Sequence, residues 1–534
     1  MCGIFFTLSE TSAELGEDEV LLDRISRRGP DSLRTCRVVW HNLTLRFTSS
    51  VLHLRGEETV QQPVRVGQNV LCWNGEAWSG LDLSLSENDT AALSNALSKN
   101  EDAIARVFEQ IRGPYAFVYY QAARGKVWYG RDILGRRSLL TNKLDTGFTL
   151  CSVGHRQNSW SEVDVKGIHC YDLCTKTTTT WPWAENPSRV HDLQKSYTRV
   201  NDLGVPASLD TKDRSTHAYK HAVSCLQAVL TDSLRIKTET LPSQVEITSE
   251  ASRIAVMYSG GVDCAVIARL LHDILPNDEP IDLLNVSFEN PRTLNNARKL
   301  DSTFNKTYET PDRVTGLQGY DELRRSCPAR EWRFVAIDVP YREAISAKDD
   351  VLELMHPNDS IMDFSIALAF YFCARGQGTL FTTGIPYHCT AKVFFSGLGA
   401  DEQLGGYSRH LAAWTRGGHN ELIKELQCDL DRIPSRNLGR DDRILAHFGR
   451  EVRWPFLDEN VISFLSQLRL DTKMTFQLGP GQGDKVILRD LARQLDIPRA
   501  AGEKKRAIQF GSRSARMEIE NGKSDKVKGH NKQS

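Results

Sequence analysis

The pattern of hydrophobic and polar positions divides the chain into two parts. In the first 180 residues, short β-branched and aromatic runs are separated by Gly and Asn turns such as Gly67-Gln68-Asn69. This pattern predicts a β-rich domain over residues 2–180. The predicted strands cover 37–40, 70–73, 115–120, 126–129 and 148–153. Asn88-Asp89-Thr90 then opens an apolar helical run, with Asn88 or Asp89 as its N-cap.

From about residue 252 the pattern changes to short, continuously apolar runs that alternate with helical segments. The runs cover 253–259, 281–288, 334–339 and 392–396, and the clearest helical segments are 264–274 and 360–375. Strands that alternate with helices predict a parallel α/β sheet. We assign this second domain to residues 251–512.

The remaining segments are polar. Residues 185–210 contain Pro187 and Pro206 and are typical of a linker. The helix predicted at 215–236 carries an apolar stripe at helical spacing, which favours core packing over a partner site. Residues 181–250 are therefore read as linker and connecting helix. The Lys-rich stretch 513–534 has no periodic apolar face and is expected to be a disordered tail.

Composition narrows the class of protein. The 534 residues are 40% hydrophobic and 25% charged, and 67 Lys and Arg balance 68 Asp and Glu. This balance argues against nucleic acid as the main partner, because phosphate binding calls for a basic excess. The longest apolar run, Ile366 to Ala374, is too short to span a membrane, and the start lacks the basic region of a secretory signal. Twelve Cys over this length are too sparse for a disulfide framework. We expect a soluble protein of the cytoplasm with no membrane partner.

Cys2 is the first residue with candidate chemistry. If Met1 is removed, Cys2 carries both a thiol and a free α-amine, whose ordinary pKa is about 7.7–8.0. The amine can then act as general base toward its own thiol, which is the logic of an N-terminal nucleophile. An inert terminal thiol is the alternative.

Further motifs accompany Cys2-Gly3-Ile4 in a fixed order. They are Arg28-Gly29-Pro30-Asp31, His53-Leu54-Arg55 ahead of Gln62-Pro63, and Trp73-Asn74-Gly75-Glu76. Together they resemble the class II glutamine amidotransferase domain of the glutamine-hydrolysing asparagine synthetases. The resemblance implies an N-terminal nucleophile-type, β-rich sandwich domain that hydrolyses glutamine at Cys2.

The resemblance also implies roles for the glutamine pocket. The Asn74 side chain and the Gly75 backbone N–H would form an oxyanion hole for the tetrahedral intermediate. Arg55 would hold the glutamine α-carboxylate by a two-pronged hydrogen bond. Asp89 and the backbone near Glu76 would hold the α-ammonium group. The alternatives are a type I′ hairpin turn for Asn74-Gly75 and a helix cap for Asp89.

A glycine loop opens the candidate nucleotide site. A predicted strand runs into Ser259-Gly260-Gly261-Val262-Asp263-Cys264, followed by a helix. Backbone N–H groups and a helix N-terminus in this arrangement suit a phosphate group. The loop lacks the Walker pattern and resembles the pyrophosphate loop of ATP pyrophosphatases. A second strand leads into a similar loop, Phe395 to Tyr407, and Asp263 and Asp401 would hold Mg²⁺ on pyrophosphate.

Two later motifs, Arg453 to Asp458 and Gly483 to Arg489, complete a set that resembles the asparagine synthetase domain. The match extends to a divergent branch of that family through segments such as Ser435 to Arg443 and Arg506 to Ser512. Lys485 and one of Lys504, Lys505 or Arg506 would neutralise phosphate charge, although each alone is more often a solvated surface cation. The residues expected to bind ATP are Ser259, Gly260, Gly261, Asp263, Cys264, Gly397, Gly399 and Lys485.

Two positions depart from the family pattern. The final Ser of the first loop is Cys264, a weaker hydrogen-bond donor. Leu398 stands between two glycines where the family carries Glu, a carboxylate thought to assist the attack of ammonia. Such help is worth about 10²–10⁴-fold in rate. Amide transfer is therefore expected to be inefficient unless another carboxylate substitutes, and the neighbouring Glu402 would point elsewhere.

The sequence predicts a two-domain asparagine synthase-type amidotransferase. Glutamine would be hydrolysed at Cys2, and ammonia would pass internally to aspartate, or another small carboxylate, activated by ATP and Mg²⁺. Its place would be asparagine biosynthesis. The alternative is a catalytically decayed, nucleotide- or glutamine-binding pseudoenzyme that acts as an interaction module, favoured by Leu398 and Cys264. A pyrophosphatase acting on RNA is a third option, against which the balanced charge argues.

Overall fold

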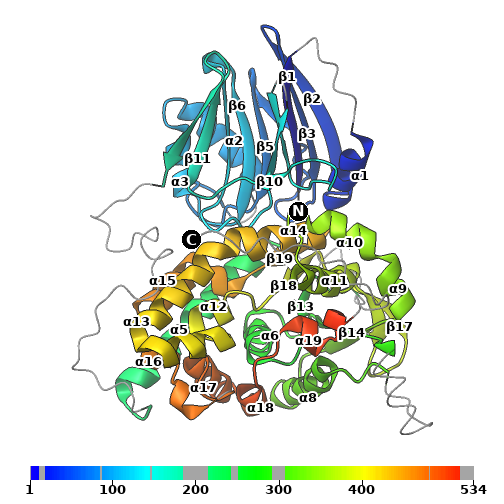
Figure 1. Cartoon of the computed structure of the whole chain (residues 1–534), viewed down its shortest axis with the longest axis vertical. Coiled ribbons are helices and arrows are strands. Elements are labelled where there is room, and N and C mark those ends of the chain that lie inside the picture. Colours follow the sequence, from blue (N-terminus) through cyan, green and yellow to red (C-terminus); the bar gives the residue numbers. More distant parts are fainter. Residues whose placement is uncertain are drawn as a thin grey trace.

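The computed structural model describes residues 2–10, 18–84, 87–144, 147–183, 214–241, 251–291, 307–479 and 481–516. The predicted linker at 185–210 and most of the predicted tail lie outside these residues. Figure 1 shows a β-rich N-terminal part, blue to cyan, stacked on a larger α/β part, green to red. This arrangement confirms the predicted fold class.

Within the described residues, the N-terminal part contains two antiparallel sheets. The first has the order β10-β8-β9-β1-β3-β2 and the second the order β12-β11-β7-β6-β5-β4. The first sheet contains β1 (Gly3–Glu10), β2 (Ser32–Trp40), β3 (Leu43–Val51), β8 (Leu140–Leu144), β9 (Gly147–Cys151) and β10 (Ser161–Glu162). The second contains β4 (Val64–Val66), β5 (Asn69–Gly75), β6 (Tyr115–Gln121), β7 (Lys126–Arg131), β11 (Gly167–Asp172) and β12 (Thr177–Pro182).

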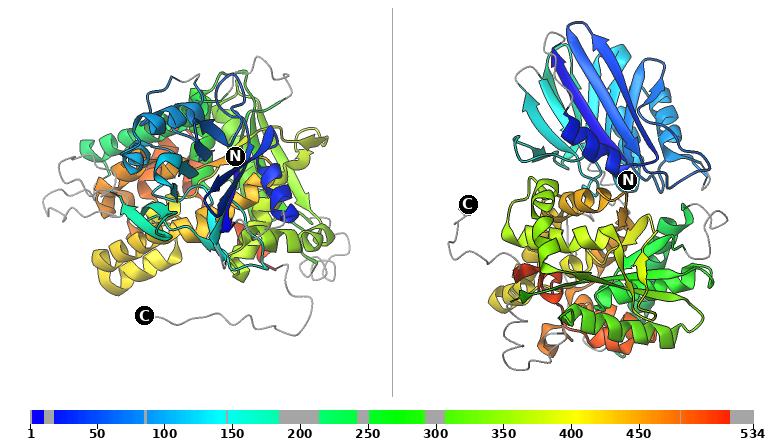
Figure 2. Two further views of the ribbon diagram at one scale, coloured as in Figure 1. Left: turned by 90° about the horizontal axis from the view of Figure 1, so that it is seen from above. Right: turned by 90° about the vertical axis from the view of Figure 1, so that its right-hand side faces the viewer.

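The two sheets form a sandwich because alternate side chains of each strand point inward. Ile4 and Phe6 of β1 pack in one cluster with Val70 of β5 and Val118 of β6. The opposite face of the second sheet packs against helices α2 (Asp89–Lys99) and α3 (Ile104–Gln110). Helix α1 (Glu19–Arg28) packs beside β1 and β3. Figure 2, right, shows the two sheets face to face above the C-terminal part.

The C-terminal sheet has the order β17-β16-β15-β14-β13-β18-β19 within the described residues. The five strands β15, β14, β13, β18 and β19 are parallel, as predicted. At one edge of the sheet, β16 pairs antiparallel with β15, and β17 pairs antiparallel with β16. The pattern did not predict these two strands because they are short and largely solvent-accessible. The strands are β13 (Ile254–Met257), β14 (Ile281–Phe288), β15 (Trp332–Val339), β16 (Gln377–Leu380), β17 (Pro386–His388), β18 (Val393–Phe395) and β19 (Glu451–Arg453).

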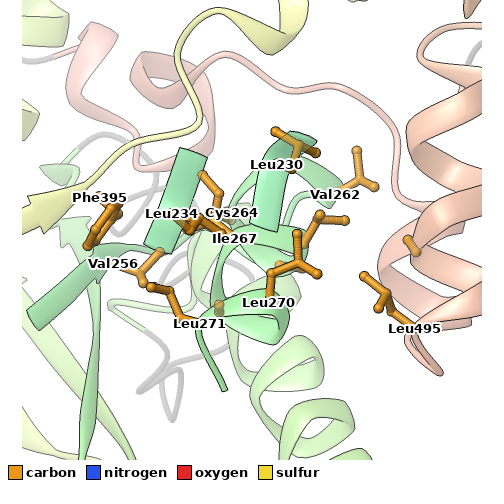
Figure 3. Close-up of a cluster of buried hydrophobic side chains, with 14 of the residues drawn as sticks. Leu230, Leu234, Val256, Val262, Cys264, Ile267, Leu270, Leu271, Phe395 and Leu495 are labelled. Carbon is orange, nitrogen blue, oxygen red and sulfur yellow. The ribbon is translucent and has the colours of Figure 1, made fainter. Parts of the chain in front are cut away.

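Helices surround this sheet and supply most of its hydrophobic core. Figure 3 shows Leu230 and Leu234 of α5 close to Ile267 and Leu271 of α6. The predicted apolar stripe of α5 is therefore core, as expected. The helices are α5 (His217–Glu239), α6 (Val262–Ile274), α8 (Pro311–Ser326), α9 (Tyr341–Ser346), α10 (Lys348–Met355), α11 (Ile361–Arg375), α12 (Ala400–Leu404), α13 (Ser408–Ile433), α14 (Gly439–Ala446), α15 (Glu459–Gln467), α16 (Leu470–Lys473), α17 (Val486–Gln494), α18 (Pro498–Gly502) and α19 (Ile508–Gly511).

The folded part extends slightly beyond residue 512. Ser512 and Ser514 are buried, and the Ser514 hydroxyl donates to the carbonyl of Ser365 in α11 at 2.8 Å. The first residues assigned from sequence to a disordered tail are therefore packed against the domain. Their polar side chains are satisfied by backbone carbonyls, which a search for apolar periodicity does not detect.

The core around α6 gives a stability prediction. Replacing Ile267, 1% exposed, by Ala removes buried methylene groups and leaves a cavity, so unfolding should become easier by about 2–5 kcal/mol. Thermal unfolding followed by circular dichroism measures the shift. Ile345→Ala, at a position that is 43% exposed, is the control and should leave the melting temperature nearly unchanged. An equal shift for both variants would contradict the assigned core.

Candidate active sites

Cys2 lies at the start of β1, where that strand reaches the boundary between the two parts (Figure 1). The Gln62 amide donates to the Cys2 Sγ at 3.8 Å and accepts from the Trp73 backbone N–H at 2.7 Å. Arg28 Nε donates to the Cys2 carbonyl at 3.3 Å. Burial raises the pKa of the thiol to about 11. The thiol is therefore protonated at neutral pH, so its use as a nucleophile requires a nearby base.

Asn74 and Gly75 end strand β5 and do not form a hairpin turn. The Asn74 side chain is fully buried, and neither its nitrogen nor its oxygen has a hydrogen-bond partner in the described structure. Buried amides are nearly always paired, so an unpaired one calls for an explanation. A Cβ at position 75 would lie 2.4 Å from the Pro114 carbonyl oxygen, so only glycine fits here. A buried amide without a hydrogen-bond partner is the arrangement predicted for an oxyanion hole.

Arg55 is committed to the backbone of a neighbouring loop. Its guanidinium donates to the carbonyls of Ala77 at 2.7 Å, Glu87 at 2.9 Å and Ser84 at 3.1 Å. Three of its five N–H donors are thus used within the protein. The structure gives Arg55 a loop-holding role, and its contact with a substrate carboxylate stays a prediction that depends on the remaining donors.

Asp89 and Glu76 are buried carboxyl groups beside the same loop. Asp89 accepts from the Ala77 backbone N–H at 2.9 Å and the Trp73 indole at 3.4 Å, whereas Asn88 is the N-cap of α2. Burial, with a contribution from Glu451, raises the pKa of Glu76 to about 8. The Glu76 side chain is therefore largely neutral at pH 7, and the binding of an α-ammonium group by Asp89 and by the backbone near Glu76 stays a prediction.

The first glycine loop leaves the carboxyl end of β13 and enters α6. Gly260 has a φ of +79°, and a Cβ there would lie 2.2 Å from the Thr315 carbonyl oxygen, so glycine is required. The Thr315 hydroxyl donates to the Ser259 carbonyl at 2.7 Å and fastens the loop to α8. Cys264 is buried, and its thiol donates to the Gly261 carbonyl at 3.2 Å. The thiol thus supports the loop from the core side.

The second glycine loop follows β18, which pairs in parallel with β13. Because parallel strands end at the same edge of a sheet, the two loops meet. A Cβ at Gly397 would lie 2.7 Å from the Cβ of Asp263. Gly399 has a φ of +100°, which favours glycine, and it begins the short helix α12 with Asp401 in its first turn.

Lys485 joins the carboxylates of the two loops. Its ammonium lies 2.6 Å from Asp263 Oδ2 and 2.5 Å from Asp401 Oδ1, and Lys505 contacts the other oxygen of Asp401. Burial raises the pKa of Asp263 despite the lysine. Burial alone would also raise the pKa of Asp401, but Lys485 and Lys505 hold it well below its usual range. Lys504 and Lys505 are both exposed residues, and it is Lys505 that is paired with Asp401.

The residues present fit a magnesium ion whose coordination shell is supplied partly by the protein and partly by phosphate oxygens. Asp263 Oδ1 is buried without a hydrogen-bond partner in the described structure. No group of three or more His, Cys, Asp or Glu side chains within the described residues is arranged to hold a metal ion. Protein-bound Mg²⁺ commonly takes only one or two carboxylates and completes its shell with phosphate oxygens and water. Asp263 and Asp401 would supply those carboxylates.

A cavity of about 470 Å³ adjoins the loops, and a smaller one of about 80 Å³ lies beside Lys485. The smaller cavity is lined by Gly261 and by basic residues such as Lys485, Lys504 and Arg506, which suit a phosphate group, and also by Asp263, Asp312 and Glu503. Leu398 lines the larger cavity. Glu402 also reaches it, but its two oxygens accept from the Gly399 N–H at 3.0 Å and the Tyr407 hydroxyl at 2.6 Å.

Sequence reasoning missed other charged residues of the larger cavity: Asp312, Asp363, Arg440 and Asp441. Asp312 lies in the first turn of α8, 3.6 Å from Arg506, and burial raises its pKa to about 7. Its position after Thr310-Pro311 was a helix-start signal that could have drawn attention to it. Arg440 and Asp441 lie within a segment already noted for its resemblance, but nothing in their spacing indicates a shared cavity.

Buried ion pairs join the two parts of the chain at α14 and β19. Arg28 pairs with Asp442 at 2.8 Å, and both side chains are at most 1% exposed. Arg443 pairs with Glu162 at 2.6 Å, and Arg137 lies 3.0 Å from Glu451. The residue that touches the Cys2 carbonyl is therefore paired with a helix of the C-terminal part.

Comparisons with known proteins give first the class of protein, through a family model, and then the branch of that family, through similar sequences. The family model of asparagine synthase matches residues 417–524. Asparagine synthetase domain-containing protein 1 of Mus musculus is 36% identical and covers 98% of both chains. That of Homo sapiens is 36% identical over 98% of this chain and 96% of its own, and a Saccharomyces cerevisiae relative of similar name is 33% identical over 93% and 88%. The chain belongs to the family of asparagine synthetase domain-containing proteins.

More distant matches are weaker. The glutamine-hydrolyzing asparagine synthetase of Gallus gallus is 24% identical over 92% of this chain and 80% of its own. Among solved structures, glutamine phosphoribosylpyrophosphate amidotransferase from B. subtilis, complexed with ADP and GMP, matches with a TM-score of 0.28 and 14% identity over 54% of this chain and 67% of its own. A likeness of this size carries no argument about the fold. No helix among the described residues is long and apolar enough to cross a membrane.

The Arg28–Asp442 contact gives a second prediction. Asp442→Asn removes the negative charge that faces the buried guanidinium groups of Arg28 and Arg137. The protein should therefore lose about 3–5 kcal/mol of stability. Differential scanning calorimetry measures this loss. Asp431→Asn, an exposed residue of α13, is the matched control and should change stability by less than about 0.5 kcal/mol. Unchanged stability in Asp442→Asn would show that the interface does not depend on this pair.

Proposed function

We propose that the chain is a glutamine-hydrolysing, ATP-dependent amidotransferase of the asparagine synthase type. Aspartate is the simplest acceptor, and asparagine biosynthesis in the cytoplasm is the corresponding role. One observation carries the proposal: the chain holds two polar sites, and an ion pair of Arg28 with Asp442 of α14 joins their surroundings. In the N-terminal part the Cys2 thiol contacts Gln62 and the buried Asn74 amide has no partner among the described residues. In the C-terminal part Lys485 joins the carboxylates of Asp263 and Asp401 beside the glycine loops. The proposed domain limits of 2–180 and 251–512 are extended by the structure, because β12 runs to Pro182, Ser514 packs against the second domain and α5 belongs to the second core.

The first half-reaction follows from the N-terminal site. After removal of Met1, the α-amine of Cys2 takes the thiol proton, and the sulfur attacks the side-chain carbonyl of glutamine. The Asn74 amide and the Gly75 N–H stabilise the oxyanion that forms. The proton returns to the leaving nitrogen, ammonia departs, and water hydrolyses the thioester to glutamate.

The second half-reaction follows from the glycine loops. A carboxylate oxygen of the acceptor attacks the α-phosphorus of ATP, and the bond to the pyrophosphate oxygen breaks. Lys485 and Lys505 neutralise the charge on the leaving pyrophosphate, and the backbone of residues 259–261 approaches its oxygens. Asp263 and Asp401 would hold Mg²⁺, which supplies further charge neutralisation on the phosphates.

The glutamine half of the proposal rests on Cys2. Cys2→Ala should abolish glutamate release from glutamine, because the nucleophile is lost. The exposed Cys174→Ala is the control and should keep full activity. Mass spectrometry should show that the active protein starts at Cys2. Fully active protein that retains Met1 would contradict the mechanism, because the free α-amine would not exist.

The ATP half rests on Asp263. Asp263→Asn should weaken Mg·ATP binding by at least about 10-fold, since it removes a proposed ligand of the cation. Isothermal calorimetry measures the dissociation constant, and the exposed Asp278→Asn is the control. If the wild-type protein binds no ATP in the presence of Mg²⁺, the hypothesis that the second domain is an active synthetase fails. The alternative hypothesis of a catalytically decayed pseudoenzyme, which Leu398 and Cys264 favour, would then gain support.

A further inference from the structure

The proposed amide transfer lacks a proton acceptor at the position where the family carries one. Leu398 lines the cavity with an apolar side chain that packs against the core cluster containing Leu457 and Phe394. Its neighbour Glu402 is held by the Gly399 N–H and the Tyr407 hydroxyl, as described above. If the reaction proceeds, another carboxylate of the same cavity must take the proton.

Helix α14 presents different charges to the two parts of the chain. Asp442 and Arg443 contact the N-terminal part through Arg28 and Glu162. Arg440 and Asp441, which directly precede them on the same helix, line the cavity that contains Leu398. Ammonia released near Cys2 would therefore meet the cavity at the wall formed by α14.

Asp441 has one oxygen fixed and the other available. Oδ1 accepts from Arg440 Nε at 2.8 Å and lies 2.7 Å from Arg440 NH2. Oδ2 has no hydrogen-bond partner among the described residues. Arg440 is held in place from the other side by Asp363 Oδ1 at 2.5 Å, and Asp363 is in turn fixed by the Ser360 hydroxyl at 2.5 Å. The free oxygen of Asp441 is thus carried by a side chain whose orientation is fixed.

We propose that Asp441 is the proton acceptor for amide transfer and takes the role that Leu398 cannot fill. This inference rests on the proposed function. The ammonia lone pair forms the new C–N bond at the acyl carbon of the adenylate, and the electron pair of the acyl C–O bond leaves with AMP. The proton lost by the nitrogen moves to Asp441 Oδ2. The products are the amide, AMP and a protonated carboxyl group that passes its proton to water.

The charges around Asp441 support this role. Arg440 and Arg443 face it from its own helix, Asp363 from α11, and Arg436 lines the same cavity from the turn before α14. Burial outweighs Arg440 and raises the pKa of Asp441 to about 6. The carboxyl group is therefore ionised at neutral pH yet more basic than an exposed Asp, which suits a general base.

The experiment measures amide formed per AMP released, with aspartate first and then a panel of small carboxylic acids. Each protein receives nitrogen either as glutamine or as ammonium chloride. Asp441→Asn should lower the amide yield about 10²–10⁴-fold with both nitrogen sources, while ATP–pyrophosphate exchange continues. Cys2→Ala is the comparison variant and should lose the yield with glutamine but keep it with ammonium chloride.

A second variant separates chemistry from structure. Leu398→Glu in the Asp441→Asn background restores a carboxylate to the cavity and should recover at least about a tenth of the lost yield. Asp441→Asn that forms amide at the wild-type ratio would overturn the inference while leaving the proposed function intact. Joint loss of pyrophosphate exchange and amide, without recovery by Leu398→Glu, would mean a structural role and would also overturn it. Wild-type protein that makes no amide from any acid would overturn the proposed function, and the inference with it.

Discussion

The pairing of buried charges across the boundary between the two parts is the constraint on which the arrangement of the molecule depends. Arg28, Arg137 and Arg443 are almost completely shielded from water, and each has a carboxylate of the other part as a partner. Separating the parts would leave these charges without compensation until water reached them. Such pairs contribute little net stability compared with apolar packing, but breaking one is costly. The ion pairs therefore fix how the two parts are positioned relative to each other, while they add little to the overall stability.

This geometry connects the two candidate sites through very few residues. Arg28 holds the backbone of Cys2 with one donor and Asp442 with another. The first turn of α14 then carries Asp441, which faces the cavity of the C-terminal part. A shift of this helix would move both the support of the thiol and the wall of the second cavity. The two candidate sites are thus connected by the short helix α14, although the residues of each site come from separate cores.

The Lys485 bridge gives the second site a defined state before any ligand arrives. Two carboxylates at 2.6 and 2.5 Å from one ammonium group satisfy its charge. Without the lysine, Asp263 and Asp401 would repel each other across a space shaped by Gly397. Under the proposed function, a polyphosphate that enters with its cation would give these carboxylates the cation as a partner and would give Lys485 the phosphate oxygens.

Sequence patterns were sufficient where the structure follows a local rule. The strands and helices with clear periods and the strand–glycine–helix loops could be predicted in this way. Asp263 and Asp401 do lie together at Lys485, but their role as cation ligands stays a prediction. Asn74-Gly75 shows the limit of local rules, since this dipeptide is typical of a hairpin turn yet ends a strand here. The loop contacts of Arg55 could not be predicted, because its partners are backbone carbonyls of an irregular loop. The place of Asp441 could not be predicted either, because its network reaches 78 residues back to Asp363.

The shared partners of Asp442 also bear on how this family can diversify. That carboxylate receives Arg28 and the Ser138 N–H, and lies 3.7 Å from Arg137. A substitution that removes the Asp442 carboxylate would take a charge partner from both Arg28 and Arg137, so it is best tolerated together with changes at those positions. Leu398, in contrast, packs against apolar neighbours of the core cluster and has no charged partner to lose. A substitution at Leu398 can therefore alter the cavity wall by itself, whereas a change at the joint between the two parts involves several residues together.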